Sequence, residues 1–346
     1  MSIKNFKFCG KLLGQGQPAF IVAEVGFNHN GDVELAKKMI ESAAKNGADA
    51  VKLQTFIAKE MISNSLMADD PDNPGNEIPF YEFFQRYELS QSDYEILFAH
   101  AKKINIPLFS TPFDEGSLEM LVELGMPAIK IASPDLTYLP FLKKVAKTSL
   151  PVVLSTGMGN EEEISQALEI LKPECPIILL HCVSNYPSQY DEMNLHCMKT
   201  LRSRFNVPIG LSDHTLDNLS AVVAASLGAV FIEKHFTVDR KLPGVDQSIS
   251  IEPSELKKLK TELIHINQIL GDEKKQIQPS EIPVKQSARR SLVARINVSA
   301  GTPLSEEMIA CKRPGTGIPA SELNYMLGKP CKIDISAEQV LTWDMF

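Results

Sequence analysis

Charged and hydroxyl-bearing side chains stand at the ends of apolar runs along this sequence. Buried strands disfavour such groups, so their repeated occurrence predicts a site where they meet. Lysine ammonium groups, together with serine and threonine hydroxyls, suit the oxygens of a phosphate or carboxylate. Two lysines in one site imply a bound polyanion, because burying an unpaired charge is costly. The residues are Glu24, Lys52, Gln54, Thr111, Lys130, Ser133, Ser155, His181, Ser212, His214, Glu233 and His235.

Two of these residues, His214 and His235, could bind one divalent metal ion. Two imidazole nitrogens completed by substrate oxygens suit manganese, iron, cobalt or zinc better than calcium, which takes oxygen ligands. The alternative is structural: the histidines could instead be hydrogen-bonded by carboxylates such as Glu233 or Asp246.

Strand-like apolar runs and helix-like periodic segments alternate eight times from the amino terminus to about Leu270. The predicted strands are Phe20–Ala23, Ala50–Gln54, Pro107–Ser110, Ala128–Ile131, Val152–Ser155, Ile177–His181, Pro208–Ser212 and Val230–His235. The predicted helices are Asp32–Asn46, Ser92–Lys103, Asp114–Leu124, Leu139–Lys147, Glu161–Leu171, Met193–Phe205, Leu216–Leu227 and Pro253–Leu270.

Eight β/α units predict an α/β fold of the TIM (β/α)8 barrel type, in which the carboxyl ends of the strands converge on the active site. A doubly wound sheet is the alternative, but it usually has about five to seven strands and a glycine-rich phosphate loop after the first. The sequence has no such loop there. Each polar residue has an ordinary explanation, such as a helix cap, and the functional prediction rests on the whole set.

Three further regions lie outside the regular repeat. Segment Thr55–Leu89, which follows the second strand, is expected to cover the substrate, although an insertion without a role is the alternative. Residues 1–275 are predicted to form the barrel domain and residues 276–289 a polar linker. Residues 290–346 are predicted to form a small β domain with strand-like pieces Ser291–Ala294 and Lys332–Ile335.

Composition limits the class of protein. Of the 346 residues, 44% are hydrophobic and 23% are charged, and the net charge is -8. No apolar run approaches the roughly 20 residues of a membrane span, no secretory signal is evident, and the six cysteines form no C-x-x-C pair. Without a clustered basic face, nucleic acid is not an expected partner. We expect a cytoplasmic protein that binds neither membranes nor nucleic acid.

Seven ordered motifs resemble the sialic acid synthase family. They are Ala23-Glu-Val-Gly-Phe-Asn-His-Asn-Gly31, Lys52-Leu-Gln-Thr55, Ser110-Thr-Pro-Phe113, Lys130-Ile-Ala-Ser133, Leu154-Ser-Thr-Gly-Met158, Gly210-Leu-Ser-Asp-His214 and Ile232-Glu-Lys-His-Phe236. In the tail, Ser291-Leu-Val-Ala and Lys312-Arg-Pro-Gly-Thr-Gly317 look like the antifreeze-type (SAF) domain of such synthases. The resemblance implies a TIM barrel and a homodimer in which each swapped tail covers the partner's active site.

The resemblance also implies the reaction, which is condensation of phosphoenolpyruvate with N-acetylmannosamine or a related amino sugar to give a nonulosonic acid. It places a divalent metal, Mn²⁺ first with Mg²⁺ or Co²⁺ as alternatives, on His214 and His235. It makes Glu24, Glu233 and the two histidines the catalytic group, with Glu24 as the candidate for proton transfer. It assigns the binding of phosphoenolpyruvate to Lys52, Thr111, Lys130, Ser133, Ser155 and Ser212. It assigns the binding of the sugar to Gln54, Asn76, Asp135, Ser184, Tyr186 and Asp246. It also implies that Arg313 in the tail reaches the sugar bound by the other subunit.

Two departures leave the sugar open. Asp135 stands where the family usually has Glu, and Ser184 replaces an Asn of the N-acetylneuraminate enzymes. The Arg289-Arg-Ser-Leu292 run looks more like synthases for legionaminic and pseudaminic acids, which use a diacetamido-trideoxy hexose. Rival hypotheses are an octulosonate or heptulosonate phosphate synthase, which would need a further cationic site, and a non-catalytic carbohydrate-binding barrel.

Overall fold

The computed structural model describes residues 5–69 and 75–346, which form two compact units. The first unit is Met1–Gly271 and the second is Asp272–Phe346, and each is described by itself. None of the helices in the described ranges is long and apolar enough to span a membrane.

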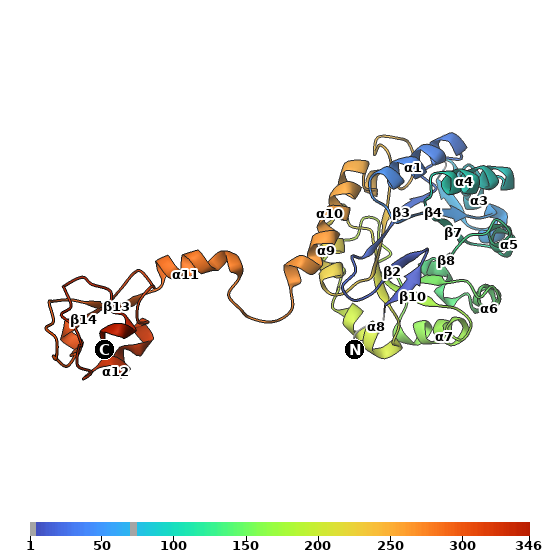
Figure 1. The fold of residues 1–346 in the computed structure, drawn as a ribbon. Helices are drawn as coiled ribbons and strands as arrows, with labels where there is room; N and C mark the ends of the chain where they lie inside the picture. Colours follow the sequence, from blue (N-terminus) through green and yellow to red (C-terminus); the bar gives the residue numbers. More distant parts are fainter. Residues whose placement is uncertain (1–4, 70–74) are drawn as a thin grey trace. The chain divides into compact units, whose positions relative to one another are not determined.

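The first unit is a closed barrel of eight parallel strands, which confirms the predicted TIM fold (Figure 1). Around the barrel the order is β10-β11-β12-β3-β4-β7-β8-β9, so the first and last strands of the repeat, β3 and β12, pair and close it. The strands are β3 (Phe20–Gly26), β4 (Ala50–Thr55), β7 (Leu108–Pro112), β8 (Ile129–Ile131), β9 (Val152–Ser155), β10 (Ile177–Cys182), β11 (Ile209–Asp213) and β12 (Phe231–His235).

Helices surround the strands and bury one apolar face against them (Figure 1). Two of them begin three or more residues later than the sequence predicts, α8 at Cys197 and α9 at Leu219. The delay before α9 has a local cause: the Asp217 carboxylate accepts a hydrogen bond from the Leu219 amide (2.9 Å), a turn that competes with helix. The helices are α1 (Val33–Lys45), α4 (Gln91–Lys103), α5 (Glu115–Glu123), α6 (Leu139–Lys147), α7 (Glu161–Leu171), α8 (Cys197–Phe205), α9 (Leu219–Ser226) and α10 (Pro253–Leu270).

A hairpin that the sequence analysis did not predict closes the amino-terminal end of the barrel. It consists of β1 (Phe6–Phe8) and β2 (Lys11–Leu13), paired antiparallel. The Phe8 ring lies edge-on to three buried phenylalanines, at centroid distances of 5.3 Å to Phe20, 6.2 Å to Phe109 and 5.7 Å to Phe231. This aromatic plug leaves the carboxyl ends of the strands as the place for polar side chains.

The long segment after β4 has elements of its own. It contains α2 (Ala58–Met61), β5 (Met67–Asp69), β6 (Glu77–Pro79) and α3 (Phe80–Gln85). An aromatic cluster packs it onto the loops that follow β3 and β7: Phe56 and Phe84 contact Phe27, and Phe56 also contacts Phe113. The segment is therefore held at the carboxyl end of the strands, where a substrate-covering role was expected.

The second unit has a small core of its own around Leu292, Ile318, Met326 and Leu341. Its only regular pairing among the described residues joins β13 (Ser291–Ala294) to β14 (Ile309–Lys312), antiparallel. The prediction of a strand at Lys332–Ile335 is wrong, because Ile335 makes just an isolated bridge to Val298. The remaining helices are α11 (Ile282–Ala288), which falls in the predicted linker, and α12 (Leu323–Met326).

Candidate active site

Two lysines and two glutamates meet inside the carboxyl end of the barrel. The Lys52 Nζ lies 2.7 Å from Glu24 Oε2 and 3.8 Å from Glu233 Oε1, and Lys130 Nζ lies 3.9 Å from the same Glu233 oxygen. All four side chains are nearly inaccessible, with exposed fractions of 1–7%. Glu24 belongs to β3, Lys52 to β4, Lys130 to β8 and Glu233 to β12. Alternate residues of each strand face the interior of the barrel, which brings these four side chains together.

The two lysines are not unpaired, so, contrary to the prediction from sequence, their burial does not by itself require a bound polyanion. In the structure Glu24 and Glu233 supply the balancing charge, since strand closure places β3 and β12 between β4 and β11. Burial raises the pKa of Glu24 to about 7, although the Lys52 ammonium acts to lower it. Near neutral pH this carboxyl group can therefore hold or release a proton.

Hydroxyl groups complete the surroundings of the lysines. Lys52 donates a hydrogen bond to Thr111 Oγ1 (2.8 Å), and Lys130 donates to Ser155 Oγ (2.7 Å) and to the Ile131 carbonyl (2.9 Å). Burial lowers the pKa of Lys130, while the nearby Glu233 raises it. Together these groups form a cluster of donors suited to an anion with several oxygens.

A second group of predicted residues lies beside the loop after β9. Ser133, at the start of the 3-10 turn η1 (Ser133–Thr137), accepts a hydrogen bond from the Gly157 amide (3.0 Å). A side chain at position 157 would collide with Ser184 Oγ and Ser133 Oγ, 2.2 and 2.8 Å from its Cβ. Ser184 Oγ and Asp135 Oδ2 are buried without a hydrogen-bond partner, and burial raises the pKa of Asp135 to about 6. These unsatisfied groups are available to a polar ligand.

His214 and His235 face each other across the ends of β11 and β12, with ring centroids 5.5 Å apart. The Nδ1 of His214 lies 2.8 Å from the Val183 carbonyl oxygen, so this nitrogen carries a proton and Nε2 is the nitrogen that could bind a metal. Burial acts to lower the pKa of His214, but its contacts with Cys182 and the Val183 carbonyl outweigh burial and raise the pKa, so a metal would have to displace a proton from Nε2. The His214 ring also packs on the Tyr186 ring, with the two ring centroids 4.1 Å apart. The Nδ1 of His235 is buried without a hydrogen-bond partner, 3.6 Å from Asp246 Oδ2.

These two rings fit a metal as donors of two nitrogen ligands. Burial lowers the pKa of His235 well below its usual range, which keeps the ring neutral, the form that binds metals. Within residues 5–69 and 75–346 no three His, Cys, Asp or Glu side chains form a ready-made metal site. The other ligands would have to come from substrate or water. The alternative, histidines hydrogen-bonded by carboxylates, is not met by the Nδ1 atoms: that of His214 bonds the Val183 carbonyl, and that of His235 lies 3.6 Å from Asp246 Oδ2 without a hydrogen bond.

The remaining predicted residues are placed as follows. The Gln54 amide donates to Glu24 Oε1 (3.1 Å), and Ser212 pairs in register with Glu233 on the neighbouring strand. Asn76 is exposed, directly before β6. Arg313 is an exposed residue of the second unit.

One expectation about strand faces is wrong. His181 points away from the barrel interior: its Nε2 lies 2.6 Å from the Met193 carbonyl and its Nδ1 3.2 Å from Cys197 Sγ. Its neighbour Cys182 faces inward instead, 4.0 Å from His214 Nδ1, and the sequence analysis missed it. The strand extends one residue beyond its predicted end, and counting alternate residues from Leu180 would have found Cys182.

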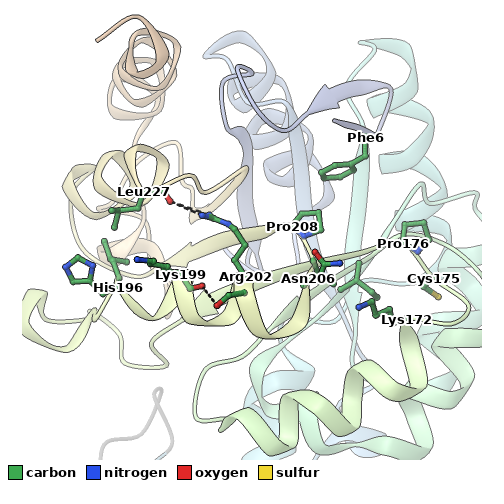
Figure 2. Close-up of a pocket in the computed structure, with 14 residues that line it drawn as sticks. Phe6, Lys172, Cys175, Pro176, His196, Lys199, Arg202, Asn206, Pro208 and Leu227 are labelled. Carbon is green, nitrogen blue, oxygen red and sulfur yellow. Dashed lines mark hydrogen bonds between the residues drawn. The ribbon is translucent and has the colours of Figure 1, made fainter. Parts of the chain in front are cut away.

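A cavity of about 1510 Å³ lies at the other end of the barrel, by the starts of β10 and β11 (Figure 2). Two of its cationic residues bind the carboxyl ends of helices. Lys172 donates to the Phe205 carbonyl at the end of α8 (2.9 Å), and Arg202 donates to the Leu227 and Gly228 carbonyls after α9. Figure 2 shows Arg202 pointing toward Leu227. These cations cap helices, as basic residues often do.

Comparison with known families identifies the chain. The model of the NeuB family matches residues 39–275, which is more than half of the sequence. This chain belongs to the NeuB family. The model of the SAF domain matches residues 289–346. Both matches confirm the resemblance seen in the motifs. NeuB synthases are enzymes that condense phosphoenolpyruvate with sugars.

Individual NeuB relatives span almost the whole chain. The N,N'-diacetyllegionaminic acid synthase of Campylobacter jejuni is 42% identical over 315 residues, 89% of this chain and 94% of the relative. The synthase of the same name from Legionella pneumophila is 38% identical and covers 96% and 95%. The crystal structure of N-acetylneuraminic acid (sialic acid) synthetase from Leptospira borgpetersenii in complex with citrate aligns with a TM-score of 0.74 at 38% identity, covering 82% of this chain and 95% of that one.

Replacing either buried lysine should weaken use of an anionic substrate. We predict that Lys52→Met and Lys130→Met each raise the KM for phosphoenolpyruvate far more than that for the sugar. Each loses a charge-assisted hydrogen bond worth about 1.5–3 kcal/mol. Steady-state kinetics with each substrate varied in turn measures the effect. Lys144→Met, which removes an exposed lysine on α6, is the control. Unchanged kinetics for phosphoenolpyruvate in both variants would contradict the assignment.

Proposed function

We propose that this chain condenses phosphoenolpyruvate with the open-chain form of an amino sugar and water, giving a nonulosonic acid and phosphate. The observation that carries the proposal is the meeting of Lys52, Lys130, Glu24 and Glu233 beside His214 and His235 at one end of the barrel, in a member of the NeuB family. This is the end at which TIM barrels carry their active sites.

The lysines position phosphoenolpyruvate in this proposal. Lys52 and Lys130 take the anionic oxygens of phosphate and carboxylate, aided by the hydroxyls of Thr111 and Ser155 that already contact them. When the substrate binds, its charge replaces part of the charge that the glutamates supply. The fixed ammonium groups also stabilise phosphate as it leaves, which is an electrostatic contribution to catalysis.

The reaction forms one carbon–carbon bond. The third carbon of phosphoenolpyruvate attacks the sugar's carbonyl carbon, water adds to its second carbon, and the carbon–oxygen bond to phosphate breaks. His214 and His235 would hold a divalent metal, which supplies Lewis acidity toward the carbonyl oxygen. Glu24 is our candidate to exchange a proton with the attacking water or the sugar oxygen, because its pKa lies at about 7.

The sugar is the finer part of the proposal. N-acetylmannosamine is one candidate. A diacetamido-trideoxy hexose is the second, and it is favoured by the two reported relatives named for N,N'-diacetyllegionaminic acid. Asp135 and Ser184, each with an unsatisfied oxygen, offer hydrogen-bonding groups to a further polar substituent on the sugar. The similarity to the Leptospira structure, named for N-acetylneuraminic acid, supports N-acetylmannosamine.

A substrate panel tests the proposal. The protein is incubated with phosphoenolpyruvate, Mn²⁺ and, in turn, N-acetylmannosamine, its 6-phosphate and diacetamido-trideoxy hexoses. We expect phosphate release and a nonulosonic acid by mass spectrometry, fastest with a diacetamido sugar. We expect none with the 6-phosphate, because the buried lysines are committed to phosphoenolpyruvate. Phosphate release with none of the sugars would refute the proposal, and turnover with the phosphorylated sugar alone would refute both sugar candidates.

Metal removal should abolish the reaction. After treatment with a chelator and verified loss of metal, we expect no turnover, with activity restored by Mn²⁺, Co²⁺ or Mg²⁺. His235→Ala should stay inactive at every metal concentration, because it lacks one of the two nitrogen ligands. Phosphate release is the measurement. Full turnover of the metal-free protein would exclude the metal role.

We also propose that the chain is a homodimer in which each SAF domain covers the partner's barrel, so that Arg313 acts on the sugar bound by the other subunit. The support is the family resemblance of the tail and the polar segment, 271–281, that precedes α11. A closed symmetric dimer is the commonest assembly of soluble proteins.

Subunit mixing tests the swapped arrangement. Arg313→Ala and His235→Ala are each expected to be nearly inactive alone. After exchange, half of the dimers are mixed, and each has one site with an intact barrel and an intact tail. About a quarter of wild-type activity should therefore return. If the tail instead covers its own barrel, every site keeps one lesion and mixing restores nothing, even where heterodimers are demonstrated.

A further inference from the structure

A buried ion pair lies directly behind the two histidines, outside the barrel interior. The Lys234 Nζ is 2.8 Å from Asp213 Oδ2, and both side chains are nearly inaccessible, at 2% and 0% exposed. Asp213 immediately precedes His214, and Lys234 immediately precedes His235. No role in the proposed reaction accounts for this pair.

Strand register explains how the pair and the histidines are related. Asp213 of β11 and Lys234 of β12 are direct partners in the parallel ladder. Successive side chains on a strand point to opposite faces, so residues 213 and 234 face the helix layer while the following histidines face the interior. The ion pair thus ties the two strands together at the point where both histidines project.

The hydrogen bonds of the pair also enclose His214. The Asp213 Oδ1 accepts from the backbone amide of Thr215 (2.9 Å) and from its hydroxyl (2.8 Å). Lys234 donates to the backbone carbonyl of Thr215 (2.6 Å). The backbone is therefore fixed on both sides of His214, at residue 213 by the strand and at residue 215 by these three bonds.

Stability alone does not explain such a pair. Taking two charges out of water costs several kcal/mol, and well-packed apolar residues of similar volume often stabilise a fold equally well. What apolar side chains cannot supply is directional bonding to the Thr215 backbone, and that bonding sets the position of His214.

We propose that the Asp213–Lys234 pair is a positioning device that holds His214 and His235 at the spacing needed to bind one metal ion. The inference rests on the metal role in the proposed function. Neither residue touches substrate or metal, and both act through the histidines that follow them.

Metal affinity of the Lys234→Met variant tests this inference. We expect Mn²⁺ binding, measured by electron paramagnetic resonance without substrate, to weaken at least about tenfold, as when the groups that orient metal ligands are removed. Affinity for phosphoenolpyruvate, measured by calorimetry without metal, should stay close to wild type. A crystal structure of the variant should show the His214 and His235 rings displaced from their 5.5 Å separation.

The matched control removes another lysine that pairs with a buried carboxylate. Lys260 on α10 lies 2.8 and 2.9 Å from the oxygens of Asp49, at the other end of the barrel. Lys260→Met should lower the melting temperature without changing Mn²⁺ affinity. If Lys234→Met does not fold, Asp213→Asn serves instead, since it keeps one oxygen as an acceptor for Thr215 but puts an amide group in place of the oxygen that binds Lys234, which breaks the tie between β11 and β12. It should also weaken Mn²⁺ binding.

The outcomes separate this inference from the proposed function. Tight Mn²⁺ binding by the wild type together with unchanged binding by Lys234→Met or Asp213→Asn overturns the inference alone. Equal loss of Mn²⁺ affinity in Lys234→Met and Lys260→Met also overturns it, because the effect would then be general destabilisation. A wild-type chain that binds no Mn²⁺, either alone or with the substrates present, overturns the inference and the metal role together.

Discussion

Burial of two ammonium groups against two carboxylates at one end of the barrel is the interaction on which the rest of the site depends. Either pair of like charges alone would be too costly to keep ionised away from water. Glu24 and Glu233 stand beside Lys52 and Lys130 and offset part of that cost. An anionic substrate that binds the lysines can therefore replace a carboxylate as their counter-charge. Glu24 is the carboxyl group that can become neutral when this happens, because its pKa is raised to about 7.

The opposite end of the barrel makes this balance possible. Phe8 and the rings it contacts are buried together in the lumen at the amino-terminal end of the strands. Gly210 belongs to the same packing, because a Cβ there would lie 2.5 Å from the Phe231 carbonyl oxygen and 2.6 Å from a Leu180 methyl. An apolar lumen strengthens every charge interaction above it, since the effective dielectric constant is low. The aromatic plug and the ionic cluster are thus parts of one arrangement.

Sequence alone predicted the strands and helices of the barrel because each is a local pattern of apolar period. It did not predict what depends on contacts across the barrel. The pairing of Lys52 with Glu24 and Glu233 follows from closure between β3 and β12, and no local pattern records it. His181 was assigned to the wrong face because the strand extends beyond its predicted end, to Cys182. The hairpin at Phe6–Leu13 was missed because strands of three residues carry too little periodicity to be recognised.

Closure of the barrel by its first and last strands has a consequence for biosynthesis. Glu24 leaves the ribosome early and Glu233 late, and Lys52 and Lys130 emerge between them. A nascent chain that stops before β12 lacks one of the two counter-charges and the neighbour that β3 requires on its open edge. The aromatic and ionic residues of the lumen therefore stay accessible to water, and to chaperones, until translation has passed the last strand. Truncated products should be substrates for quality control instead of folded fragments.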